Sequence, residues 1–402
     1  MDMRVQPVLA QVALGYAPMI DRQRMVSALR LTVFPLRPEA PPPADLLIAA
    51  VTEAWPAEGG RVSLNVVSET LLHDLLAAEL PPNLMLEVPA FVAAQPQEVA
   101  ALRALHGRGT TLLLKGRPRE PLARDLLPCF AYAIVDVAEE RRDGAPAPGT
   151  PARQIPHVQE GVRTLKAMNE AFARGAHSVL GWPLDDEDDG AAVAPGKGGQ
   201  PEMQTVTELI KRVDREENAD RLEAVLKNDP ALAFKLMRYI NSPLFGLRVE
   251  ITSFRHALML LGYGRLKRWL ALLLVSAGKD ANSKPIMYAA VRRGLLMEEL
   301  GRNVGADDEQ RGELFICGMF SLLHRLMRQP LEVLLTSIPV PERVRQALLD
   351  ETGPFRPILD LVRAVEASAL YDIRTAAEAL MMGLPEVNRA VFKALSEARQ
   401  LE

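Results

Sequence analysis

The feature that most constrains this chain is a change of sequence pattern across residues 185–202. This segment holds the acidic run DDEDDG, followed by alanine, glycine and proline residues. It has too few apolar side chains to bury against a core, which is typical of a linker or an exposed loop. The chain has 402 residues, more than one domain of roughly 100–200 residues. We therefore predict two domains, over residues 1–184 and 203–402, with this acidic Gly/Pro segment between them.

The first half alternates short β-rich runs with stretches of helical periodicity. Candidate strands include VQPVLAQVAL near the start, then RVSLNVV, NLMLEVP and YAIVDV. Candidate helices such as SETLLHDLLAAE and PQEVAALRALHGRG lie between them. Strand and helix alternating at this spacing indicate βαβ units with mostly parallel strands. Because the unit repeats many times before residue 185, we predict a (β/α) barrel that closes on itself.

The second half loses the β-rich pattern. Leu222, Val225 and Leu226 follow helical spacing, and a further apolar stripe continues through Ile316 and Phe320. Apolar residues at this period are typical of amphipathic helices. We therefore predict an all-α bundle of several short helices in this half.

Composition and charge exclude several classes of protein. The 47 Lys and Arg against 51 Asp and Glu leave a formal net charge of -4, so no strong positive field gathers nucleic acid. Two cysteines, Cys129 and Cys317, cannot form a disulfide framework. No apolar stretch reaches the ~18 residues that span a bilayer. We predict a cytoplasmic protein that has no membrane partner.

The usual catalytic motifs are missing. The sequence holds no HExxH zinc motif, no GxxxxGK[ST] phosphate loop and no GxSxG nucleophile elbow. His73-Asp74 is a literal HD dipeptide, but it lies in LLHDLL within a candidate barrel helix. We interpret it as the solvated turn of an amphipathic helix.

The strand ends of the first half carry polar residues in a characteristic order. Asn65 lies in SLNVVS, Glu87 ends LMLE, Asp136 ends IVD, and Glu160 begins EGVRT. In order and spacing, these segments resemble those of the EAL domain, the barrel that hydrolyses cyclic di-GMP in bacteria. The resemblance covers nearly all of residues 5–184 and implies an EAL-like barrel.

The chain departs from the EAL pattern at the residues that would hold metal. Leu29 or Arg30 occupies the position of the signature Glu, and Lys115-Gly116 aligns with the paired Asp of the family. Two-metal hydrolysis needs several carboxylates to bind the ions and lower the pKa of water. A lysine ammonium at that place repels a divalent cation. We therefore predict a degenerate EAL domain that is not an enzyme and uses no metal or other cofactor.

The four matching residues Asn65, Glu87, Asp136 and Glu160 leave two interpretations open. They form a vestigial binding site for cyclic di-GMP, or they are structural residues whose hydrogen bonds hold the strand ends. The second interpretation is the more common outcome for polar residues at such positions.

The second half contains the most specific passage of the chain. NDPALAFKLMRYINSPLFG is followed by ITSFRHALMLLGYGRLKRWL. The Asp-Pro pair, the Asn-Ser pair and the Ala-x-x-x-Leu-Gly pattern resemble the HDOD domain, a helical relative of the HD phosphohydrolases without their metal ligands. The resemblance covers about residues 203–395 and matches the domain order of EAL–HDOD signalling proteins.

These observations predict a signal-transduction protein that acts by binding. In the favoured interpretation it is a protein-binding scaffold or regulator in a cyclic di-GMP-linked network, with signalling proteins bound by the HDOD domain. The alternatives are a catalytically inactive receptor with cyclic di-GMP at the barrel mouth, and an active phosphodiesterase. Binding of nucleic acid has only Arg265, Lys267 and Arg268 in its favour.

Overall fold

The computed structural model describes residues 6–56, 59–119, 121–140, 155–185, 201–226, 254–276 and 281–399. The chain forms two compact units. The barrel unit comprises residues 1–188 and 363–389, and the helical unit comprises residues 189–362 and 390–402. The domain boundaries predicted from the sequence stay a prediction. Most of the predicted linker, and the NDPALAFKLMRYINSPLFG passage, lie outside the described residues.

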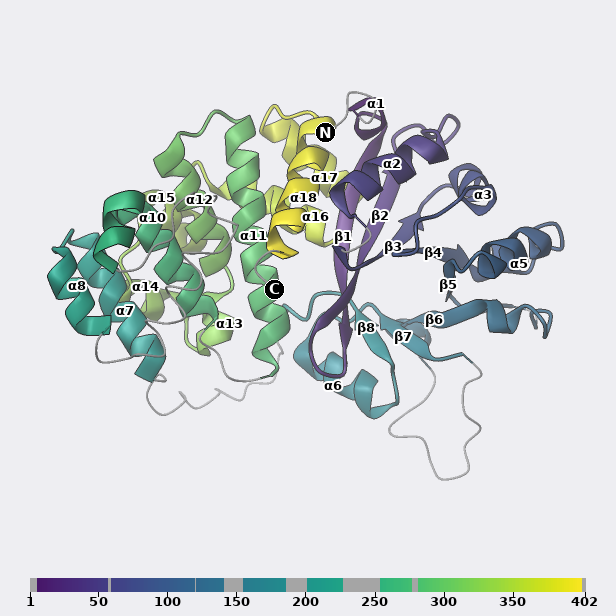
Figure 1. Ribbon diagram of the computed structural model, residues 1–402, viewed down its shortest axis with the longest axis horizontal. Coiled ribbons are helices and arrows are strands. Elements are labelled where there is room, and N and C mark those ends of the chain that lie inside the picture. Colours follow the sequence, from purple (N-terminus) through teal and green to yellow (C-terminus); the bar gives the residue numbers. More distant parts are fainter. Residues whose placement is uncertain are drawn as a thin grey trace. The chain divides into compact units, whose positions relative to one another are not determined.

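Eight described strands of the barrel unit close into a barrel, which confirms the predicted architecture (Figure 1). The strands are β1 Val12–Asp21, β2 Val26–Pro35, β3 Arg61–Val66, β4 Leu84–Pro89, β5 Thr111–Lys115, β6 Phe130–Asp136, β7 His157–Glu160 and β8 Ser178–Leu180. Neighbouring strands from β2 to β8 run parallel. Strand β1 is antiparallel to both β2 and β8.

The start of the chain differs from the prediction. We expected a strand over residues 5–14, but Gln6–Leu9 forms the short helix α1 and β1 begins at Val12. Strands β1 and β2 then form a hairpin whose turn includes Arg24 in the left-handed region, with φ 64°. A hairpin needs no crossover helix, so the connection between β1 and β2 supplies no helix to the outside of the barrel.

Helices around the barrel connect β2 to β3, β3 to β4, β4 to β5 and β7 to β8 (Figure 1). In chain order these are α2 Ala44–Ala54, α3 Glu69–Ala77, α4 Ala90–Ala93, α5 Val99–Gly107 and α6 Leu165–Ala173. Helix α3 shows why such a segment is helical: the Ser68 side chain accepts a hydrogen bond from the Leu71 amide at 3.3 Å and caps the first turn. Leu71, Leu72, Leu75 and Leu76 then form one buried face.

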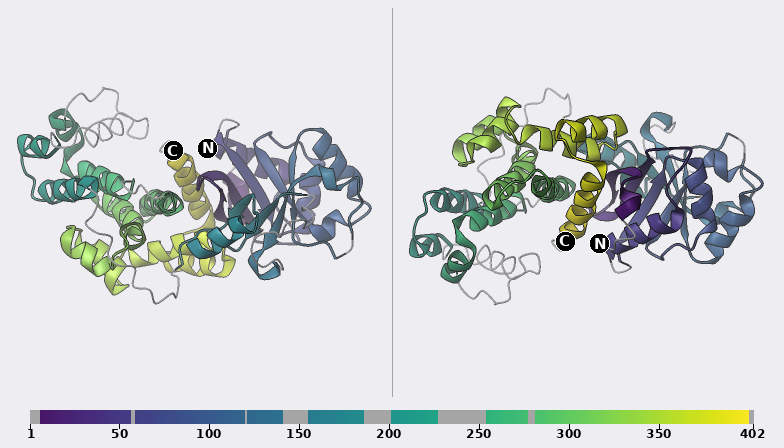
Figure 2. Two further views of the ribbon diagram at one scale, coloured as in Figure 1. Left: turned by 90° about the horizontal axis from the view of Figure 1, so that it is seen from below. Right: turned by 90° about the horizontal axis from the view of Figure 1, so that it is seen from above.

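Residues 363–389 add a layer to the barrel unit beside β1. Helix α17, Leu370–Ala379, contacts β1, and the two lie side by side in Figures 1 and 2. The fully buried Asn388 amide donates to the carbonyls of Leu9 at 2.9 Å and Val12 at 2.8 Å. Its oxygen accepts from the Leu14 amide at 3.1 Å. Because buried backbone groups need partners, Asn388 fixes this segment against the start of β1.

The helical unit is all-α, as its periodicity predicts (Figure 2). Its first described helices are α7 Pro201–Asp214, α8 Ala219–Leu226, α10 Phe254–Ser276, α11 Ser283–Asn303 and α12 Asp308–Phe320. They are followed by α13 Leu323–Met327, α14 Leu331–Ser337, α15 Glu342–Arg345 and α16 Arg356–Glu366, whose last residues belong to the barrel unit. Helix α18, Leu384–Arg399, contributes its residues from Ala390 onward to the helical unit. Within the described ranges, no helix combines the length and the apolar character needed to cross a membrane.

Candidate functional site

The candidate site lies inside the barrel, at the end where the parallel strands finish, which we call the barrel mouth. One layer of apolar side chains fills the barrel below it: Met19, Ala28, Met85, Leu113, Ile134, Val158 and Leu180. Side chains two positions further along a strand point to the same side of the sheet. The next inward layer is therefore polar, with Arg30, Glu87, Lys115, Asp136 and Glu160.

Arg30 links two of the predicted site residues. Its Nε donates to both carboxylate oxygens of Glu87, at 2.8 and 3.1 Å, and its Nη1 donates to the carboxylate of Glu160. The Ser63 hydroxyl adds a hydrogen bond of 2.8 Å to Glu87 Oε1. One guanidinium thus forms ion pairs with two carboxylates, which come from strands β4 and β7.

This cluster is buried to different depths. The Glu87 side chain is completely buried, Arg30 is 7% exposed, and Glu160 keeps 23% of its side-chain surface in contact with solvent. Burial alone would lower the pKa of Arg30, but the charges of Glu87 and Glu160 outweigh it and raise the pKa above its ordinary value. Arg30 therefore stays charged at neutral pH, as arginine does in proteins generally.

Lys115, at the end of β5, brings a third predicted site residue into the mouth. Its Nζ donates to the Asn65 side-chain oxygen at 2.9 Å, and the Asn65 amide donates to the Thr32 hydroxyl at 3.3 Å. Burial lowers the pKa of Lys115, and the positive charge of Arg30 lowers it further, while Glu87 and Glu160 partly oppose the shift. Within the described part of the chain, Lys115 has no carboxylate partner.

Asp136 stands apart from the other predicted site residues. Its carboxylate accepts a hydrogen bond of 2.7 Å from the Ala138 amide and caps the short 3-10 helix Val137–Glu139. Gly161 lies against the same carboxylate, where an added Cβ would be 3.3 Å from Asp136 Oδ2. In the structure, Glu87 and Glu160 both bind Arg30, and Asn65 accepts a hydrogen bond from Lys115. Asp136 acts within its own local segment, as a helix cap. Whether these four residues bind a ligand stays a prediction.

Two residues of the mouth were missed from the sequence. Ser63 and Thr32 complete the hydrogen bonds of Glu87 and Asn65. The alternation of side chains along a strand could have predicted them. Ser63 lies two positions before Asn65 on β3, and Thr32 lies two positions after Arg30 on β2, so each points to the same side of the sheet as that neighbour. The same alternation decides between Leu29 and Arg30, since only Arg30 shares the inward side with Ala28.

The residues at the mouth do not fit a divalent cation as they lie. Mg²⁺ and Ca²⁺ prefer carboxylate oxygens, but Glu87 and Glu160 both accept hydrogen bonds from Arg30. The ammonium of Lys115 adds positive charge to the same layer. Among the residues that the structure describes, no three His, Cys, Asp or Glu side chains are placed to share an ion.

Comparison with known proteins identifies the helical region. Residues 201–331 match the family model of the HDOD domain, which confirms that part of the prediction. Together with the closed barrel, this match confirms the predicted architecture of a (β/α) barrel followed by an HDOD-type helical region.

Two relatives match most of the chain. The uncharacterized protein YuxH of Bacillus subtilis is 24% identical over 324 residues, which are 77% of this chain and 77% of that protein. Cyclic di-GMP phosphodiesterase CdgJ of Vibrio cholerae is 24% identical over 335 residues, which are 80% of this chain and 76% of that protein.

Solved structures give only distant similarities. The calcium and cyclic di-GMP complex of Klebsiella pneumoniae BlrP1 has a TM-score of 0.29 and 18% identity, over 44% of this chain and 55% of that chain. The FimX EAL domain from Pseudomonas aeruginosa bound to cyclic di-GMP has a TM-score of 0.29 and 14% identity, over 46% of this chain and 94% of that chain. Scores this low decide nothing about the fold, which the strand pairing shows directly.

One prediction is wrong and needs correction. We predicted from the missing carboxylates that the chain is not an enzyme, yet CdgJ, a phosphodiesterase by name, aligns with 80% of it. At 24% identity that activity does not transfer to this chain either. The departures at Arg30 and Lys115 therefore do not exclude hydrolysis, and turnover has to be measured.

Proposed function

We propose that this chain is a signal-transduction protein of a cyclic di-GMP-linked network and that its barrel mouth binds the nucleotide. The HDOD match over residues 201–331 and the relative CdgJ support the network. The observation that carries the binding site is the ammonium of Lys115, a half-buried cation of the mouth that lacks a carboxylate partner among the described residues.

The chemistry of recognition follows from the charges of the mouth. A phosphodiester is an anion, and a charge-assisted hydrogen bond from an ammonium to its oxygen is about twice as strong as a neutral one. Arg30 is already engaged by Glu87 and Glu160, so it contributes little to a new ligand. Lys115 donates to the neutral side chain of Asn65 and keeps further N–H donors for a phosphate. The hydrogen bond to Asn65 holds the ammonium in the mouth before the ligand arrives.

The regulatory step requires a difference between two states. A nucleotide shifts a protein between states only when it binds them with different free energies. In this proposal the helical unit binds a signalling protein, and nucleotide at the mouth changes that affinity. By linkage, the partner protein then changes the affinity for the nucleotide by the same factor.

A second candidate function is a protein-binding scaffold that needs no nucleotide. It is favoured by the cluster of Arg30, Glu87 and Glu160, in which each charge already has an internal partner. Such a cluster holds strand ends together without any ligand.

Titration calorimetry of the full chain with cyclic di-GMP separates the two candidates. The wild-type chain is compared with Lys115→Met, Lys115→Arg and Arg61→Met. Arg61 is an exposed cation at the first residue of β3, at the barrel end opposite the mouth, and serves as the matched control. Each titration is run with a chelator and again with Mg²⁺ or Mn²⁺, and the products are separated by chromatography to measure hydrolysis.

Nucleotide binding at the mouth predicts a clear order of affinities. Lys115→Met is expected to weaken binding about 10-fold or more, since the lost charge-assisted hydrogen bond is worth ~1.5–3 kcal/mol. Lys115→Arg should keep most of the affinity, and Arg61→Met should match the wild type. A flat wild-type trace favours the scaffold, and equal weakening by Lys115→Met and Arg61→Met rules out the mouth as the site.

A further inference from the structure

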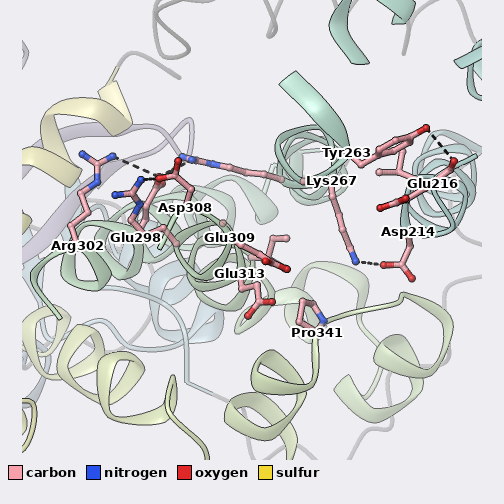
Figure 3. Close-up of a pocket in the computed structure, with 16 residues that line it drawn as sticks. Asp214, Glu216, Tyr263, Lys267, Glu298, Arg302, Asp308, Glu309, Glu313 and Pro341 are labelled. Carbon is pink, nitrogen blue, oxygen red and sulfur yellow. Dashed lines mark hydrogen bonds and ion pairs between the residues drawn. The ribbon is translucent and has the colours of Figure 1, made fainter. Parts of the chain in front are cut away.

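The helical unit contains a pocket of its own, lined by residues that the barrel mouth does not use (Figure 3). Its volume is about 670 Å³, within the range of roughly 300–1,000 Å³ that is usual for ligand pockets. Residues from the end of α7, from α10, α11 and α12, and Pro341 form its walls. All of these wall residues belong to the helical unit.

Charged side chains of both signs line the pocket, and the negative ones are in excess. Among the described lining residues, the six carboxylates are Asp214, Glu216, Glu298, Asp308, Glu309 and Glu313, and the four cations are Lys267, Arg268, Arg302 and Arg311. Six negative and four positive charges leave a formal net charge of -2. The charge of the lining therefore favours a cationic ligand over an anionic one such as a nucleotide.

Internal ion pairs account for these four cations of the lining. Lys267 pairs with Asp214, and Arg311 pairs with Asp308. Arg268 binds Glu298 with its Nη1 at 2.7 Å from Oε1, and Arg302 lies 3.9 Å from the same carboxylate. The cations are thus engaged and present little free positive charge to a ligand.

Two carboxylates of the lining are left over. Glu216 and Glu309 are exposed and have no ion-pair partner among the residues that the structure describes. A third, Glu313, lies one helical turn from Glu309 on α12 and receives one hydrogen bond from Arg343, at 3.0 Å. Figure 3 shows Glu309 and Glu313 on one side of the pocket, with Lys267 and Asp214 on the other. The pocket thus has two exposed carboxylates in its lining whose charge no ion pair among the described residues offsets.

One wall of the pocket contains three side chains that contact one another, and another part of the lining is apolar. The guanidinium of Arg268 stacks 4.1 Å from the ring centroid of Phe315 while it binds Glu298, so three side chains hold one another in place. Val213 and Ile316 are buried beside the charged groups. A long side chain with an apolar stem and a positively charged head suits such a lining. Its stem can pack against the apolar residues while its charged head contacts the carboxylates.

We propose that this pocket binds an arginine side chain in a basic segment of a partner protein. The guanidinium would lie between Glu309 and Glu216, with its stem against Val213 and Ile316. The inference deepens the proposed function and rests on it, because it names the chemistry of the partner that the helical unit binds. It rests on the binding of a signalling protein by the helical unit, and it does not depend on nucleotide binding at the barrel mouth.

Fluorescence anisotropy with short labelled peptides tests the proposal on the full chain. The probe is Gly-Arg-Gly-Arg-Gly, and its match is the same peptide with neutral citrulline in place of arginine. The variants are Glu309→Gln, Glu216→Gln and their combination. Glu332→Gln on α14 removes an exposed carboxylate of the same unit outside the pocket lining and serves as the control.

The proposal predicts that the arginine peptide binds at least about 10-fold more tightly than the citrulline peptide. The double variant should lose about 10-fold or more, each single variant a smaller factor, and Glu332→Gln nothing. Equal binding of the two peptides, or an equal loss in the double variant and Glu332→Gln, would overturn it. Displacement of the peptide by spermidine at equal concentration would also overturn it, since the pocket would then be a polyamine site.

The outcome is distinguishable from failure of the proposed function. If the arginine peptide fails to bind while cyclic di-GMP still binds through Lys115, only the partner assignment is wrong. If the peptide binds and cyclic di-GMP gives a flat trace, the scaffold remains and the nucleotide site is wrong.

Discussion

The barrel mouth and the pocket of the helical unit use the same residue types in different proportions. At the mouth, Arg30 is held between Glu87 and Glu160, and the side chains of Arg30 and Glu87 are almost out of contact with water. In the described lining of the pocket, four cations face six carboxylates, and Glu216 and Glu309 are exposed. Where charges are buried, each needs a partner, whereas an open pocket tolerates surplus charge. The cluster around Arg30 is suited to holding strand ends together, and the pocket is suited to recognising a charged partner.

The largest effect on stability is expected when one partner of the buried cluster at the barrel mouth is removed. Glu87→Ala leaves the guanidinium of Arg30 and the hydroxyl of Ser63 without their principal acceptor. We expect the free energy of unfolding to fall by about 3–5 kcal/mol, as for other buried ion pairs that lose one member. Urea unfolding of the full chain measures the change.

A compensated variant provides the control for that result. Arg30→Met combined with Glu87→Leu and Glu160→Leu removes all three charges of the cluster and keeps apolar volume, so it should recover most of the lost stability. If the triple variant is as unstable as Glu87→Ala, the loss arises from the shape of the site and not from an unpaired charge.

A buried ion pair in the helical unit tests whether burial determines how much stability is lost. If burial is the cause, the loss should depend on how exposed the pair is and not on which unit contains it. Glu298 is 9% exposed and binds Arg268, which is 20% exposed. Glu298→Ala is expected to cost about 2–3 kcal/mol, less than Glu87→Ala, because Arg268 keeps some contact with water. The exposed Glu332→Ala should change the unfolding free energy by less than ~0.5 kcal/mol. Equal losses in Glu298→Ala and Glu332→Ala would remove burial as the cause.

Titration of Lys115 tests the mouth in another way. Since burial and then Arg30 lower its pKa, the ammonium loses its proton at a lower pH than an ordinary lysine. Affinity for cyclic di-GMP should therefore decline as the pH rises through that lowered pKa. Lys115→Arg should move the decline to higher pH, because arginine keeps its charge. A decline at the same pH in both proteins would contradict the role of Lys115.

Stability should respond to the same proton with the opposite sign. The lowered pKa means that the unfolded chain holds the Lys115 proton more tightly than the folded chain. The contribution of Lys115 to stability is therefore least favourable at low pH, and it improves as the pH rises from the lowered pKa toward the ordinary 10.5. Comparison with Lys115→Met isolates this contribution.

A small effect on stability is expected at an exposed ion pair of the pocket lining. Arg311 pairs with Asp308, whose side chain is 79% exposed. Arg311→Gln should change the unfolding free energy by no more than about 1 kcal/mol, because exposed ion pairs contribute little. It should also strengthen binding of the arginine peptide, since it removes a competing cation from the lining. Weaker binding in this variant would contradict the charge argument.

The sequence predicted the elements that depend on local periodicity. Alternation of strand and helix predicted the barrel, and helical spacing predicted the second half. The hairpin of β1 and β2 was missed because its turn around Arg24 lacks the usual Asn-Gly or Gly signal. The contact of Asn388 with Leu14 was beyond prediction, since it joins positions separated by 374 residues.

At the site, residue positions were predictable and their partners were not. Asn65, Glu87 and Glu160 were singled out as strand-end residues, and the structure places them at the mouth. That Arg30 would bind Glu87 and Glu160 together depends on how the barrel closes, which brings β2, β4 and β7 around one axis. Such an arrangement leaves no trace in the spacing along the chain.

The most direct test of the central claim measures whether Arg30 occupies the carboxylates of Glu87 and Glu160 and keeps them from a metal ion. Binding of Mn²⁺ to the full chain is titrated by electron paramagnetic resonance in the wild type, in Arg30→Gln and in Arg30→Glu. We predict that both variants bind Mn²⁺ at least about 10-fold more tightly than the wild type, because freed carboxylates are good ligands for a divalent ion. Equal affinity in the three folded proteins would contradict the claim.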